Sequence, residues 1–147
     1  MRRAPLIGLA LIFVLSGCGG GSSKALTKEE YAAKADALCG KYNEQTKSLA
    51  SPKSLSDLAK VADQTLPILD HAINDLSKLH PPASEKALSD QWLTQVRNLK
   101  GDLQEIRDKA KTGDIQAVQA VVPKAQAHNS QSNQLATQLG MSVCNKD

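Results

Sequence analysis

The chain of 147 residues contains three cysteines, whose positions predict two kinds of chemistry. Cys18 directly follows an apolar segment near the start of the chain, whereas Cys39 and Cys144 are separated by most of its length. No two cysteines have the C-x-x-C spacing of a metal or redox motif. A thiol at the end of an apolar leader indicates modification during export, and two distant thiols indicate a disulfide.

Cys18 is predicted to carry lipid. It ends the sequence LSGC, after a basic start at Arg2 and Arg3 and a ten-residue apolar stretch at 6–15. Ten helical residues rise only about 15 Å, half of a bilayer core, so the stretch indicates a cleaved signal peptide and no membrane span. The tetrapeptide resembles the lipobox of bacterial lipoproteins, which implies diacylglyceryl transfer to Cys18 and cleavage directly before it. The alternative is an ordinary secretory signal in which Cys18 has no role.

Cleavage would divide the chain into three parts: a signal peptide at 1–17, a lipidated tether at 18–26 and a helical domain at 27–147. The tether contains GGGSS and spans roughly 15 Å as a flexible coil, so the domain is expected to stay close to the membrane. Lipid on Cys18 would anchor it to the extracytoplasmic face of the cell membrane. Net charge falls from +3 to +1 with the two leader arginines, which argues against nucleic acid as a partner.

Cys39 and Cys144 are then the only thiols left in an oxidising compartment, and an even pair there predicts a disulfide. A loop of about 105 residues would stabilise the fold by at most about 4.7 kcal/mol in the chain-entropy model. Two inert buried thiols are the alternative.

The domain is predicted to be an all-α, four-helix up-down bundle. Apolar residues recur at spacings of three and four, no segment alternates as a strand does, and short connections make neighbouring helices antiparallel. Thr27 and Glu30 are predicted to form a capping box, and Gly113 is predicted to be a left-handed C-cap. The predicted helices cover residues 27–50, 54–79, 84–112 and 114–139.

Pro67 and Pro123 lie inside the second and fourth of these segments. Each removes one backbone hydrogen bond and is expected to kink its helix. Kinks that wrap the helices around a small core are the simpler interpretation, and a hinge or an opened ligand cavity is the other.

A polar run at residues 128–134, HNSQSNQ, covers almost two helical turns, so some polar side chains must point inward. The apolar spacing of the segment places His128 and Ser132 at the inward positions. A buried imidazole needs hydrogen-bond partners, and Tyr42 is the candidate from the first helix. Three interpretations stay open: a solvated edge of the bundle, an internal polar layer, and a ligand pocket of Tyr42, His128 and Ser132.

Known catalytic and ligand-binding motifs are absent from the sequence. No Glu-x-x-His pair, zinc-protease motif, haem-attachment motif, nucleophile elbow or phosphate loop occurs, so neither catalysis nor a cofactor or metal is expected. The acidic residues mostly have lysines nearby and are interpreted as solvated helix faces. The mature chain keeps only Tyr31, Tyr42 and Trp92 as aromatic residues, too few for a base-stacking surface or an aromatic sugar groove.

Four segments of the chain are similar to a group of short exported proteins and lipoproteins of actinobacteria. They read LTKEEY at 26–31, ADALC at 35–39, LHPP at 79–82 and LGMSVC at 139–144. The resemblance covers nearly all of the mature chain. It implies a helical domain closed by a Cys39–Cys144 bridge, and it implies no activity and no site residues.

The end of the chain is expected to climb along the first helix to form the disulfide. If the end of the fourth helix lay level with the start of the first, the tail from Gly140 to Cys144 could barely reach Cys39. We therefore expect the fourth helix to stop partway along the first, whose start would overhang toward the membrane. Gly140 would reverse the chain, and Met141 and Val143 would pack against the first helix.

Three functions are compatible with this sequence. The favoured one is a non-enzymatic envelope lipoprotein that contacts another envelope protein or the cell wall. The second is a small-ligand binder with a polar site near His128, and the third is an enzyme of unfamiliar design.

Overall fold

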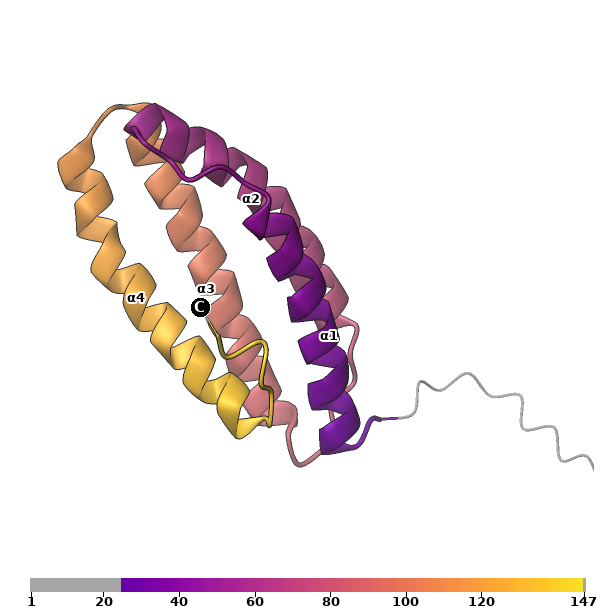
Figure 1. Cartoon of the computed structure of the whole chain (residues 1–147). Helices are drawn as coiled ribbons and strands as arrows, with labels where there is room; N and C mark the ends of the chain where they lie inside the picture. The colour runs from indigo at the N-terminus through magenta and orange to yellow at the C-terminus, as the bar shows by residue number, and fades with distance from the viewer. Residues whose placement is uncertain (1–24, 147) are drawn as a thin grey trace, which may run out of the picture.

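A computed structural model describes residues 25–146, which form four helices and, within this range, no strand. These are α1 (Lys28–Lys47), α2 (Leu55–Ser77), α3 (Lys86–Lys111) and α4 (Ile115–Gln138). Contacts run mainly from α1 to α2, from α2 to α3 and from α3 to α4, which confirms the predicted up-down order (Figure 1). The proposed leader and Cys18 lie outside the described residues.

Three of the four helices begin where a side chain can cap the backbone. The Thr27 hydroxyl accepts from the Glu30 amide at 3.1 Å, and the Glu30 carboxylate accepts from the Thr27 amide at 2.9 Å, so the predicted capping box is present. The Ser54 and Asp114 side chains likewise accept a hydrogen bond from the backbone amide three residues later, at the starts of α2 and α4. The exception is α3, which begins two residues later than predicted and has no side-chain cap.

The two internal prolines do not divide their helices. Pro67 lies within α2 and Pro123 within α4, and each helix continues on both sides of its proline. The reversal after α3 uses Gly113, whose φ of 75° is left-handed, as the C-cap signal predicts.

The core is divided into two clusters along the bundle. The larger one lies at the end where α1 begins and is centred on Tyr31 and Trp92, with Leu139 and Met141 also buried. Burial raises the pKa of the Tyr31 hydroxyl, which hydrogen-bonds to the buried Ser89 hydroxyl at 2.5 Å. The smaller cluster, at the opposite end, is formed by Ala59, Ala110 and Val118 and includes no residue of α1. Figure 1 shows why, since α1 ends well short of the end where α2 begins.

The chain end climbs between α4 and α1 and closes the bundle with a disulfide (Figure 1). Cys39 and Cys144 are joined, with their Cα atoms 5.3 Å apart, so the predicted bridge is present. The Asp36 carboxylate accepts hydrogen bonds from the Ser142, Val143 and Cys144 amides at 2.7, 2.9 and 3.0 Å, and from the Ser142 hydroxyl at 2.9 Å. Although partial burial opposes ionisation of Asp36, these four bonds hold its pKa below the ordinary value.

The stagger between α1 and α4 is about one helical turn. A Cβ at Gly140 would lie 3.9 Å from the Ala32 Cβ and 4.0 Å from the Lys28 Cε, so α4 ends within about one turn of the start of α1. The expected stagger, with α4 stopping partway along α1, therefore amounts to only about one turn. From Ala32 to Cys39 the tail must climb only about 10 Å, well within its reach. Gly140 does reverse the chain, with φ at 82°, and Met141 is buried in the core.

Candidate functional site

The contact between α3 and α4 contains a buried charge, which is the first component of the candidate site. The Asp102 side chain is only 3% exposed, and it faces two side chains of α4. The Nδ1 atom of His128 lies 2.6 Å from Asp102 Oδ2, and the Lys124 Nζ lies 3.1 Å from Asp102 Oδ1. Since a carboxylate only accepts, the proton in the first contact belongs to Nδ1 of the ring.

Helical periodicity accounts for this meeting of side chains. On α3, Asp102 follows Leu99 by three residues and precedes Ile106 by four, which places it on the same face as these apolar residues. On α4, Lys124 and His128 are four residues apart and share one face, and the antiparallel arrangement brings that face level with Asp102. Lys124 and His128 thus provide two partners for the Asp102 carboxylate, which would be costly to bury alone.

Lys124 connects this buried carboxylate to the surface. Its side chain is 51% exposed, and its Nζ also lies 2.7 Å from the Glu105 carboxylate. Hydrogen bonds to Glu105 and then to Asp102 raise the pKa of Lys124 above its ordinary value. The ammonium therefore stays charged at neutral pH and keeps Asp102 compensated.

The inward positions predicted for the polar run of α4 are confirmed in part. Ser132 is buried, with 4% of its surface exposed, and the His128 side chain is 25% exposed at the rim. The hydrogen bond between His128 and the buried Asp102 fits the interpretation as an internal polar layer better than that of a wholly solvated edge. Asp102 contradicts the interpretation of the acidic residues as solvated helix faces.

Tyr42 does not join this polar layer. Its hydroxyl donates to the Asp75 carboxylate of α2 at 2.6 Å, and the Lys41 ammonium lies 4.7 Å from the centre of its ring. The hydrogen bond from Tyr42 is the main reason why the pKa of Asp75 lies below its ordinary value. The predicted pairing of Tyr42 with His128 is therefore wrong, because each side chain has a partner on its own neighbouring helix.

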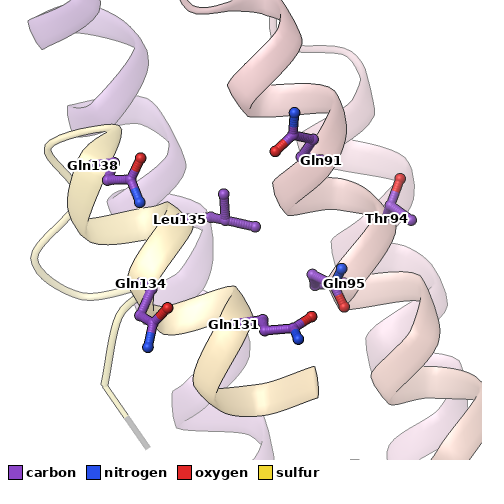
Figure 2. Close-up of a pocket in the computed structure, with 7 residues that line it drawn as sticks. All are labelled: Gln91, Thr94, Gln95, Gln131, Gln134, Leu135 and Gln138. Carbon is purple, nitrogen blue, oxygen red and sulfur yellow. The ribbon is translucent and has the colours of Figure 1, made fainter. Parts of the chain in front are cut away.

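A groove lined by amides lies on the outer side of the same helix pair, one turn beyond His128. Figure 2 shows side chains from α3 and α4 on its two walls. Its volume is about 330 Å³, at the lower end of the range for small-ligand pockets. The lining residues are Gln91, Thr94, Gln95, Gln131, Gln134, Leu135 and Gln138. We call this feature the amide groove.

A second hollow adjoins the amide groove on α4 and shares Gln134 with it. Its volume is about 400 Å³, and amide and hydroxyl side chains line it throughout. From Ala125 to Asn145 the sequence has no Asp, Glu, Lys or Arg. This end of α4 thus presents a continuous surface of neutral hydrogen-bonding groups.

Sequence reasoning missed both Asp102 and the amide groove. The signal for Asp102 was its spacing from Leu99 and Ile106, which places it within the apolar face. No comparable signal exists for the groove, because it requires the flank of α3 at Gln91 and Gln95 to lie beside the flank of α4. That pairing depends on the rotation of two helices about their axes.

The described residues contain neither a metal-like cluster nor a membrane-spanning helix. Within 25–146, no three side chains of the His, Cys, Asp or Glu type come together in a way that could hold a metal ion. None of the four helices combines the length and the hydropathy needed to cross a bilayer. Comparison with protein-family models, with curated proteins and with solved structures gives no match.

Proposed function

We propose that this chain is a lipid-anchored protein of the bacterial cell envelope and serves as a non-enzymatic interaction module. The Cys39–Cys144 disulfide is the observation that carries the proposal, because such bonds persist in oxidising compartments outside the cytosol. The lipobox-like sequence ending at Cys18 supports it independently. Membrane attachment would follow from the acyl chains on that cysteine.

The arrangement of the bundle supports a domain that is anchored by one end. The Leu26 amide donates to the His80 carbonyl at 2.9 Å, which ties the start of the described chain to the connection between α2 and α3. Gly140 adjoins Lys28 and Ala32, so the end of α4 lies at this same end of the bundle. The proposed tether would therefore hold this end toward the membrane, and the sides of the helices would remain available to partners.

Replacing the anchoring thiol tests the proposal. Cys18→Ala should release the protein from the membrane fraction into the aqueous envelope or the medium. Ser23→Ala, which alters the proposed tether and leaves the LSGC sequence intact, is the matched control and should remain in the membrane fraction. Retention of the Cys18→Ala protein on membranes after a high-salt wash would contradict the anchoring.

The identity of a partner can be sought in intact envelopes. Crosslinking followed by pull-down of the anchored protein should recover a specific envelope protein or cell-wall fragment if the domain is an interaction module. Cys18→Ala is again the control, since it removes the protein from the membrane and leaves the folded domain unchanged.

A second candidate function is the binding of a small ligand beside His128 and Ser132. The observation in its favour is the buried Asp102, which places a charge in the contact between α3 and α4 with the partly exposed His128 at its rim. A ligand that binds only the folded state would raise the unfolding temperature. A thermal-shift panel of metabolites and metal ions on the wild-type protein and on His128→Gln would test this function.

A further inference from the structure

We propose that the amide groove between α3 and α4 binds a neutral, polyhydroxylated glycan. Five glutamine side chains from the two helices line it, as Figure 2 shows. This inference rests on the proposed function and deepens it by assigning a chemical class to the partner.

The chemistry of the groove matches that of sugar hydroxyl groups. Each glutamine amide offers two donors and a carbonyl acceptor, and each hydroxyl can donate and accept in return. The groove contains no charged side chain that could compensate an anionic or cationic ligand. Because unpaired charges are expensive to desolvate, this lining favours a neutral ligand over a phosphorylated or sulfated one.

The amides of the groove retain hydrogen-bonding capacity. Gln95 accepts a hydrogen bond from the Asn98 side chain at 3.3 Å, which orients its carbonyl. Among residues 25–146, the structure gives no hydrogen-bond partner to the side-chain amides of Gln91, Gln131, Gln134 and Gln138. These amides can therefore turn toward a ligand without breaking a bond within the fold.

The neutral lining is a local feature of this helix pair. Farther along the same pair, a neighbouring hollow is lined by Glu105, Lys109 and Lys124. Ion pairs of this kind are the ordinary way to solvate a helix surface. The lining between the two helices thus changes from charged side chains in that hollow to amides in the amide groove.

The position of the groove fits an envelope glycan as the occupant. Gln91 lies near the start of α3 and Gln138 at the end of α4, so the groove belongs to the end of the bundle that the proposed tether would hold toward the membrane. Trp92 is only 1% exposed and Tyr31 is fully buried, so neither offers a stacking surface for a sugar ring. Affinity must then come from hydrogen bonds that compete with water, and we expect a Kd of about 1 mM.

The direct test is a titration followed by the side-chain amide signals in nitrogen–proton NMR spectra. Residues 19–147 are suitable, because every helix, both core clusters and the disulfide lie within them. The probes are short neutral oligosaccharides of glucose, galactose, mannose and arabinose, each compared with its sulfated form. This fragment lacks Cys18, so the titration does not depend on membrane anchoring. Its outcome can therefore be interpreted even if the Cys18→Ala experiment contradicts the anchoring.

We expect at least one neutral oligosaccharide to shift the amide signals of Gln131 and Gln134, with saturation in the millimolar range. Gln95→Ala combined with Gln131→Ala should weaken that binding at least about tenfold, whereas Gln64→Ala on the exposed face of α2 should leave it unchanged. Three results would overturn the proposal: no shift with any neutral probe up to about 20 mM, tighter binding of the sulfated form, or the same shifts on raising protein concentration alone. The last result would identify a second copy of the chain as the occupant.

Discussion

Asp36→Asn is expected to destabilise the domain strongly, because one carboxylate orders the whole chain end. Oδ2 of Asp36 accepts from the Ser142 amide and hydroxyl, and Oδ1 accepts from the Val143 and Cys144 amides. An asparagine retains one acceptor oxygen and turns an NH₂ group toward the other pair of donors, so two bonds are lost. Hydrogen bonds to charged groups contribute about 1.5–3 kcal/mol each, and the lower value applies at a half-exposed site, which gives about 3 kcal/mol in total.

Thermal unfolding of the oxidised protein by far-UV circular dichroism measures this effect. For a domain of this size, about 4 °C of Tm corresponds to 1 kcal/mol, so the expected fall is about 12 °C. The matched control is Asp90→Asn, because Asp90 forms an exposed ion pair with Lys86 one turn away on α3. That control should change stability by no more than about 0.5 kcal/mol. If the Tm of Asp36→Asn equals that of the control, the carboxylate does not hold the tail and the reasoning is refuted.

Three further predictions concern the same closure. The wild-type domain should lose stability as the pH falls below about 4. The reason is that the pKa of Asp36 is lowered in the folded state and returns to its ordinary value in the unfolded state. Acid denaturation should therefore show a shallower loss of stability for Asp36→Asn than for the wild type. Val143→Asp should destabilise by about 2–3 kcal/mol in thermal melts, because it places a charge on a half-buried side chain beside α1, whereas an unchanged Tm would mean that the tail is not packed. Mass spectrometry of the non-reduced, alkylated protein should find neither Cys39 nor Cys144 labelled, and labelling of both would contradict the bridge.

The secondary structure was predictable because its determinants are local. The capping box at Thr27, the cap at Asp114 and the left-handed Gly113 each depend on neighbouring residues alone. The inward position of Ser132 likewise follows from the helical repeat of α4. The disulfide was predictable from the number of cysteines, because only one pairing is possible once Cys18 is assigned to lipid.

The contacts between helices were not predictable, because they depend on register and rotation. Asp36 has no local sequence signal for its role, since its partners follow it by more than a hundred residues. Tyr42 was assigned to the wrong partner because the neighbour of α1 at that level is α2, where the Asp75 carboxylate accepts a hydrogen bond from the Tyr42 hydroxyl. The existence of a stagger between α1 and α4 was predictable from the reach of the tail, whereas its extent of about one turn was not, because it depends on how the two helices pack.

The intact mass of the protein extracted from bacterial membranes tests the central claim most directly. We predict a chain that begins at Cys18, carries a diacylglyceryl group there and lacks the two hydrogens lost on forming the Cys39–Cys144 bond. An unmodified chain, or one that begins at another residue, would contradict lipid anchoring through Cys18.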